Sequence, residues 1–344
     1  MSETDEVLLS VRNLYVEFST DDGLVSAVND LSYDLKRGKT LAIVGESGSG
    51  KSVSSMALMG LVAGMNAKVS GEVYFDGQQL VGADPESVRK LRGDRMAMIF
   101  QDPLSSLHPF FRIGDQLVEA VQVHHDIDKK QAQVRVKAML ERVGIPDVDQ
   151  RMNEYPHQLS GGMRQRVMIG MSLINNPELL IADEPTTALD VTVQAQILEL
   201  LKDLQKEFGT AIILITHDLG VVADMADEVV VMYGGSAVEH APVREIFYEP
   251  AMPYTWGLIA SIPQISAKHA HLDPIPGNPP SLINLPSGCV FAPRCTFKHL
   301  VSDGLCENER PQLLPVSPEH TSRCHLTQNQ RTDIRRERLI GRQK

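Results

Sequence analysis

The feature that most constrains the fold of this chain is a glycine-rich run at residues 45–52, Gly-Glu-Ser-Gly-Ser-Gly-Lys-Ser. An apolar stretch, 40–44, precedes it, and a stretch with apolar residues on one side, 52–60, follows it. This is the order of a strand, a loop and a helix, in which glycines let backbone N–H groups converge on phosphate oxygens. The sequence therefore predicts an α/β fold built around a phosphate-binding loop (P-loop).

The P-loop supplies candidate ligands for ATP and for Mg²⁺. Lys51 is expected to bridge the β- and γ-phosphates, and the hydroxyl of Ser52 is expected to ligate Mg²⁺. The residues predicted to bind ATP through this loop are Gly45, Glu46, Ser47, Gly48, Ser49, Gly50, Lys51 and Ser52.

Two carboxylates close a second apolar run, 179–182. Such a continuous run is typical of a central strand in a buried parallel sheet, where charged groups are costly unless they have a task. Asp183 is the better candidate to hold Mg²⁺ through water, and Glu184 to polarise the attacking water. The run at 212–215 predicts a further strand of this sheet, followed by His217.

Between these motifs lies a Ser-Gly-Gly element at 159–166, Leu-Ser-Gly-Gly-Met-Arg-Gln-Arg. With the three motifs in this order, the chain resembles the nucleotide-binding subunits of ABC transporters from about residue 7 to 326. The resemblance implies a P-loop NTPase (RecA-like) core with an antiparallel β subdomain, together forming a nucleotide-binding domain over 1–249. It also implies a helical subdomain at about 103–178 that reaches toward a transmembrane partner.

The resemblance assigns further residues to the site. Gln101 resembles the Q-loop glutamine that touches Mg²⁺ and the transmembrane partner, and His217 the switch histidine that contacts the γ-phosphate. Phe18 matches the aromatic residue on which adenine stacks, with Tyr15 as the alternative. Two such subunits sandwich two nucleotides, so part of each site comes from the partner. The residues expected to contact the partner's nucleotide are Ser160, Gly161, Gly162 and Asp190.

From residue 250 the composition changes. More than half of the 20 prolines and all four cysteines lie beyond this point, so regular structure must be short there. Clustered thiols in a proline-rich extension, here 250–326, suggest a metal site that replaces a hydrophobic core. The candidate ligands are Cys289, Cys295, Cys306 and Cys324. Four unrelated cysteines are the alternative, and the absence of a Cys-x-x-Cys knuckle weakens the zinc interpretation.

The extension, with Ile-Pro-Gly-Asn-Pro-Pro at 275–280, resembles that of the oligopeptide and dipeptide permease ATPases, the oligopeptide type more closely. In that family four cysteines are associated with a [4Fe–4S] cluster; Zn²⁺ is the alternative, and the spacing leaves Cys306 the least certain ligand. The resemblance implies peptide import, with a related second ATPase, two membrane permease subunits and an external peptide-binding protein as partners. Nickel or haem as cargo stays open.

Charge and hydropathy limit the remaining function classes. The formal net charge of −11 argues against nonspecific binding to nucleic acid or anionic lipid. No apolar stretch is long enough to span a membrane, and no signal peptide is evident, so we expect a peripheral protein at the cytoplasmic face of the bacterial inner membrane. A chromosome-organising ATPase would need a long coiled-coil insertion, which the sequence lacks. The basic segment 327–344 is expected to be a disordered tail.

Overall fold

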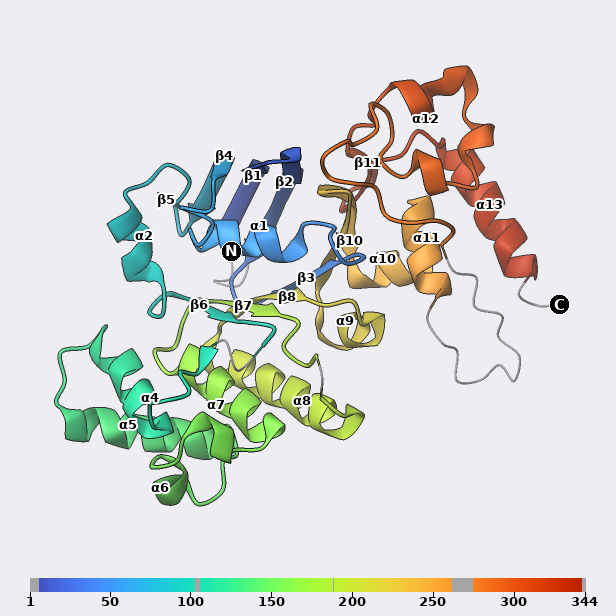
Figure 1. Cartoon of the computed structure of the whole chain (residues 1–344). Coiled ribbons are helices and arrows are strands. Elements are labelled where there is room, and N and C mark those ends of the chain that lie inside the picture. The colour runs from blue at the N-terminus through green and yellow to red at the C-terminus, as the bar shows by residue number, and fades with distance from the viewer. Residues whose placement is uncertain (1–5, 103–105, 188, 262–274, 342–344) are drawn as a thin grey trace.

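The computed structural model describes residues 6–102, 106–187, 189–261 and 275–341 (Figure 1). The start of the predicted helical subdomain, at 103–105, and Ala188 of the Thr-Ala-Leu-Asp segment lie outside the described residues. No helix among the described residues is both long and apolar enough to cross a membrane.

An antiparallel sheet at the N-terminus has the strand order β2-β1-β4-β5. Its long strands β1 (Val7–Thr20) and β2 (Gly23–Lys36) form a hairpin, and β4 (Ala67–Phe75) pairs with β1 and with the short β5 (Gln78–Gln79). Apolar side chains of these strands are buried against α1 and the main sheet. This is the antiparallel β subdomain that the resemblance implies.

The main sheet is mixed and has the order β11-β12-β10-β9-β3-β8-β7-β6. Five strands are parallel; they are β3 (Thr40–Val44), β6 (Met96–Ile99), β7 (Leu179–Asp183), β8 (Ala211–Ile215) and β9 (Glu228–Tyr233). Every residue of β3, β6, β7 and β8 is buried, as their continuous apolar runs predict. The carboxyl ends of these strands therefore meet at one edge, where ligands bind in such sheets.

Helices cover the main sheet and form a separate lobe (Figure 1). Those flanking the main sheet are α1 (Lys51–Leu58), α8 (Val191–Phe208) and α9 (Leu219–Met225). The short α2 (Pro85–Leu91) lies beside β5 (Figure 1). The lobe, drawn in green, contains α4 (Ile113–Gln122), α5 (Lys129–Arg142), α6 (Val148–Arg151), η2 (Pro156–Gln158) and α7 (Gly161–Leu173). Its apolar residues share one core with the inner face of α8.

The C-terminal extension completes the main sheet. Strand β12 (His320–Ser322) pairs with β10 (Ser236–Pro242), and β11 (Leu314–Ser317) adds the outermost strand. The other elements after β10 are α10 (Val243–Tyr248), α11 (Pro253–Ala260), η3 (Ala292–Arg294), η4 (Lys298–Leu300), η5 (Ser302–Gly304), α12 (Leu305–Asn308) and α13 (Gln328–Gly341). Extension residues share a core with β9 and β10, so the extension is packed onto the nucleotide-binding domain.

The predicted disorder of 327–344 is wrong for Gln328–Gly341, which form α13. Ile334 of this helix is buried against Trp256 and Leu326. Thr327 and Gln330 exchange hydrogen bonds in the manner of a capping box, since the Thr327 amide donates to Gln330 Oε1 at 2.8 Å and the Gln330 amide to Thr327 Oγ1 at 3.4 Å. The high charge of the segment favoured disorder in the sequence interpretation, although Thr327 and Gln330 cap the helix and Ile334 packs it against the extension.

Candidate active site

The P-loop joins β3 to α1 and closes tightly around its lysine. A Cβ added at Gly45 would lie 2.2 Å from the carbonyl oxygen of Met232, and one at Gly50 2.2 Å from that of Ala27, so neither position accepts a side chain. Lys51 is buried, and its Nζ donates to the carbonyl oxygens of Gly45 at 2.8 Å and Glu46 at 2.9 Å. Burial lowers the pKa of Lys51, while the nearby carboxylates, Glu184 first, act in the opposite direction.

Two of the three residues predicted to serve Mg²⁺, Ser52 and Asp183, are in contact. Ser52, in the first turn of α1, donates from Oγ to Oδ1 of Asp183, the last residue of β7, at 3.1 Å. Burial raises the pKa of Asp183, and the hydrogen bond from Ser52 opposes that shift. A hydroxyl and a carboxylate oxygen side by side are the hard oxygen donors that Mg²⁺ prefers, so these residues fit the ion. When bound, Mg²⁺ neutralises charge on the phosphate oxygens.

Glu184 is the centre of a polar cluster at the ends of three parallel strands. Its Oε2 accepts hydrogen bonds from Gln101 Nε2 at 3.0 Å and from Thr187 Oγ1 at 2.8 Å. Its Oε1 lies 3.3 Å from Nδ1 of His217. The structure thus brings together Gln101, Glu184 and His217, the three residues predicted to act in catalysis, and adds Thr187, whose part as a carboxylate partner the sequence did not reveal.

The backbone at Glu184 adopts a left-handed conformation, with φ of 47°. A non-glycine residue there is strained, and the strain persists only where neighbours fix the conformation. The Glu184 amide donates to the carbonyl oxygen of Ile215 at 2.9 Å, and Gln165 of α7, which is buried, donates from Nε2 to the carbonyl oxygen of Pro185. These contacts hold the backbone at the end of β7, where Glu184 lies.

Comparisons with known proteins agree with this geometry. Residues 28–187 match the model described as ABC transporter, and residues 238–300 match the model of the oligopeptide/dipeptide transporter C-terminal region. The oligopeptide transport ATP-binding protein OppD of Haemophilus influenzae is 55% identical over 84% of this chain and 90% of its own length. The dipeptide transport ATP-binding protein DppD of Bacillus subtilis is 50% identical over 95% and 97%.

The chain belongs to the oligopeptide/dipeptide ABC transporter ATPase family. A solved dimeric ATP-binding cassette with ADP and phosphate has the same fold, with a TM-score of 0.62 and 27% identity over 69% of this chain and 99% of that one. The chain is therefore an ABC ATPase that hydrolyses ATP, with the P-loop NTPase fold expected from the sequence. Family membership implies dimerisation and association with transmembrane permease subunits.

The Ser-Gly-Gly element of this ABC ATPase faces solvent. Ser160 caps α7 by accepting a hydrogen bond from the Met163 amide at 3.2 Å, and both Ser160 and Gly161 are exposed. Asp190 caps α8 by accepting from the amides of Thr192 and Val193. The N-terminus of α7 thus presents free N–H groups and its positive dipole end outward, as a site for an anion on another molecule requires.

The remaining predicted ATP ligands differ in exposure. Ser47 and Gly48 are exposed at the tip of the P-loop, whereas Ser49 is buried. Phe18 lies on β1, half-buried against the core of the antiparallel sheet, so its stacking on adenine stays a prediction. Glu46 directs its carboxylate at Arg294 of the extension. This arginine, and Tyr254 beside it, are contacts of the P-loop that sequence reasoning missed.

The four cysteines gather in the extension without disulfides. The Cys289 amide donates to the carbonyl oxygen of Cys306 at 2.8 Å. Cys306, which the spacing made the least certain metal ligand, is therefore in backbone contact with another cysteine. Burial raises the pKa of Cys289 to about 12 and that of Cys295 to about 11, and the neighbouring thiols add to both shifts. In the described ranges, however, no three His, Cys, Asp or Glu residues are arranged to hold a metal ion, so the structure does not present the predicted metal site.

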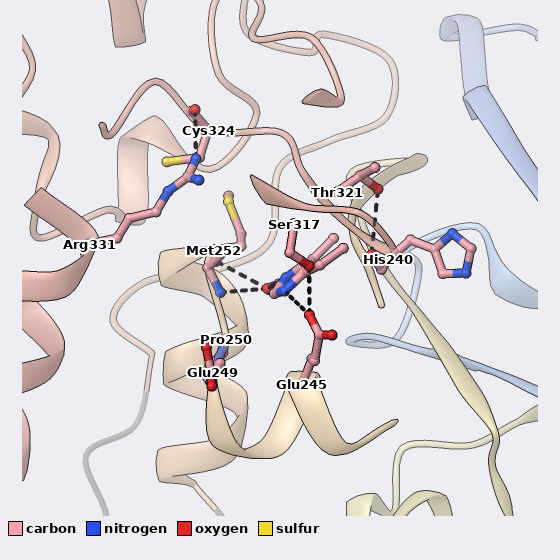
Figure 2. Close-up of polar contacts among 12 residues, drawn as sticks. His240, Glu245, Glu249, Pro250, Met252, Ser317, Thr321, Cys324 and Arg331 are labelled. Carbon is pink, nitrogen blue, oxygen red and sulfur yellow. Dashed lines mark hydrogen bonds and ion pairs between the residues drawn. The ribbon is translucent and has the colours of Figure 1, made fainter. Parts of the chain in front are cut away.

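Polar contacts hold the extension in place near Cys324 (Figure 2). Arg331 of α13 points at the carbonyl oxygen of Cys324, 3.2 Å from its Nη2, and Ser317 donates to Glu245 at 3.0 Å (Figure 2). His320 of β12 lies between two carboxylates, with Nε2 2.7 Å from Glu239 and Nδ1 3.1 Å from Glu245. The thiol region is therefore tied to the main sheet by hydrogen bonds as well as by apolar packing.

Proposed function

We propose that this ABC ATPase is the motor subunit of a bacterial peptide importer, working at the cytoplasmic face of the inner membrane. What carries the proposal is that one chain combines the Gln101–Glu184–His217 cluster with a C-terminal region that matches the oligopeptide/dipeptide transporter model. Relatives named for oligopeptide transport and for dipeptide transport are about equally similar, and we favour oligopeptides on the basis of the Pro-Gly-Asn-Pro-Pro segment. Nickel and haem are the competing cargoes.

In the proposed cycle, two ATPase subunits close on two ATP molecules. Lys51 binds the β- and γ-phosphates, and Ser52 and Asp183 hold Mg²⁺. Glu184 accepts the proton of the attacking water, while His217 contacts the γ-phosphate and Gln101 links the site to the permease. The outward-facing N-terminus of α7, with Ser160 and the following glycines, binds the γ-phosphate on the partner subunit. Closure and reopening then drive the two membrane subunits.

The test of this function is peptide-dependent growth. A strain that lacks the chain should fail to take up tri- to pentapeptides as an amino-acid source, and plasmid-borne wild-type protein should restore uptake while a Lys51→Ala protein should not. Retained peptide uptake together with lost nickel or haem uptake would identify one of the competing cargoes. Loss of dipeptide uptake alone would place the chain with the dipeptide transporters.

We further propose that the four thiols hold a [4Fe–4S] cluster, bound by Cys289, Cys295, Cys306 and Cys324. The support is chemical: four free, mutually close thiols lie in one desolvated region, and thiolates hold such clusters. Because the described side chains are not in a metal-binding arrangement, binding requires them to reorient. Anaerobically purified protein should absorb near 400 nm and contain about four iron atoms per chain. One zinc per colourless chain would show a zinc site instead, and metal-free active protein would rule out both.

A further inference from the structure

Arg294 joins the C-terminal extension to the P-loop by a two-point ion pair. Its Nη1 lies 2.5 Å from Oε2 of Glu46, and its Nη2 lies 3.1 Å from Oε1 of the same carboxylate. The arginine side chain is 6% exposed and the glutamate side chain 26%. Paired bonds of this kind fix orientation as well as distance, so the Glu46 side chain is held in one place.

Arg294 is itself fixed by contacts with the extension and with β9. Its Nε donates to the carbonyl oxygen of Pro276 at 2.8 Å, and its Nη1 donates to the hydroxyl of Tyr233 at 3.2 Å. The guanidinium also lies over the Tyr233 ring, 5.7 Å from its centroid. Because these contacts fix the guanidinium of Arg294, the position of the Glu46 carboxylate depends on the position of the extension.

The backbone of Glu46 is held at both of its polar groups. Its amide donates to the hydroxyl of Tyr254 in α11 at 2.9 Å, and its carbonyl oxygen accepts from Lys51 Nζ at 2.9 Å. The Tyr254 ring packs against Tyr233 and Phe291, at centroid distances of 4.5 and 5.4 Å. One residue of the P-loop thus connects the phosphate-binding lysine to an aromatic cluster of the extension.

The charge of Glu46 makes this pairing important for nucleotide binding. Its carboxylate is close enough to act on the charge of Lys51, so it lies near the place where the triphosphate binds. An unpaired carboxylate there would repel the phosphates, and the repulsion would be strong because the loop is partly buried. Arg294 neutralises this carboxylate before ATP arrives.

We propose that Arg294 is a positioning residue of the nucleotide site, which sets the affinity for ATP by neutralising Glu46 and fixing the start of the P-loop. Arg294 acts through Glu46, the P-loop residue with which it forms the ion pair. The extension, which the family match alone would connect with transport, then contributes directly to ATP binding.

The test measures the affinity of the purified full-length chain for a fluorescent ATP analogue with Mg²⁺. Arg294→Gln should weaken binding about tenfold, because it leaves Glu46 unpaired. Adding Glu46→Gln to that variant should restore affinity to within about threefold of wild type, because the repelling charge is gone. A variant that only loosened the fold would not be rescued in this way. Arg294→Lys keeps the positive charge but cannot form both hydrogen bonds to Glu46. Its affinity for the ATP analogue should lie between those of the wild type and Arg294→Gln.

Arg323 offers a matched control. It also directly precedes a cysteine, and it pairs with Asp30 on β2 at 2.9 Å, with side-chain exposures of 6% and 26% like those of the Arg294–Glu46 pair. Arg323→Gln should lower the melting temperature yet leave ATP affinity within about twofold of wild type. Wild-type affinity of Arg294→Gln, absence of rescue by Glu46→Gln, or an equal loss in Arg323→Gln would each overturn the proposal.

Discussion

His217 and Glu184 face each other across 3.3 Å, from imidazole Nδ1 to carboxylate Oε1, at the ends of neighbouring parallel strands. The pairing of β7 with β8 places Asp183 opposite Ile215, so the residues that follow each strand emerge side by side. The register of two buried strands therefore brings the hydrolytic residues Glu184 and His217 together.

The first prediction concerns Glu184 as the group that accepts the proton of water. In the assembled transporter, Glu184→Gln should lower ATP turnover by roughly 10²-fold or more while ATP binding is retained. The glutamine preserves the hydrogen bonds but cannot take the proton. Steady-state ATPase assays combined with nucleotide-binding measurements check this. Glu207→Gln, on a surface ion pair with Arg142, is the control and should have wild-type turnover; near-normal turnover of Glu184→Gln would refute the assignment.

A second prediction concerns the exposed N-terminus of α7. Ser160→Arg places a long cationic side chain where the partner's nucleotide would enter, so closure and ATPase activity should be lost while ATP still binds this chain's own P-loop. Crosslinking or light scattering with ATP would report closure. Gln133→Arg, at an exposed position on α5, adds the same side chain elsewhere and should close normally. A lone subunit whose full activity does not depend on concentration would argue against a shared site.

A third prediction follows from the raised pKa of Asp183. Burial disfavours the ionised carboxylate of Asp183 in the folded chain. Asp183 therefore lowers the free energy of unfolding as the pH rises above 3.8, the ordinary pKa of an aspartate. At neutral pH, Asp183→Asn should therefore raise the melting temperature of the nucleotide-free protein. The same change should lower Mg²⁺-dependent ATP turnover by roughly 10–100-fold, as loss of an outer-shell metal partner does. A variant less stable than wild type between pH 6 and 8 would contradict this account.

The apolar run that precedes it predicted Glu184, whereas the resemblance to ABC transporter subunits assigned Gln101 and His217. The sequence did not predict Thr187 or Gln165, since ordinary polar residues gain their part only when the turn after Glu184 is folded. Arg294 and Glu46 lie 248 positions apart, and no local pattern indicates such a pair. The helix α13 was missed because Ile334, which is buried, lies in a segment of mostly charged and polar residues.

The fourth prediction concerns this helix. Ile334→Asp would place a charge against Trp256 and Leu326, and should destabilise the extension by about 2 kcal/mol or more. Limited proteolysis should then cut near α13 while ATP binding is retained. Thr332→Asp adds the same charge on an exposed position two residues earlier and should leave the helix protected. Equal protease sensitivity of the two variants would show that Ile334 does not anchor the helix.

The last prediction concerns the buried Glu239–His320 pair. Glu239 is fully buried and accepts hydrogen bonds from the amides of Ala251 and Met252 at 2.5 and 3.2 Å as well as contacting His320. His320→Ala removes a partner of a desolvated carboxylate and should cost about 3 kcal/mol of unfolding free energy, measured by denaturant titration.

A comparison pair of the same chemistry joins β10 to its other neighbour in the sheet, β9. His240 is 2.9 Å from Glu228, but this pair is more exposed, so His240→Ala should cost less than about 1 kcal/mol. Glu239→Gln should recover part of the loss when combined with His320→Ala, because the amide leaves no buried charge behind. If His320→Ala proved no more harmful than His240→Ala, the Glu239–His320 contact would not be what holds β12 to β10.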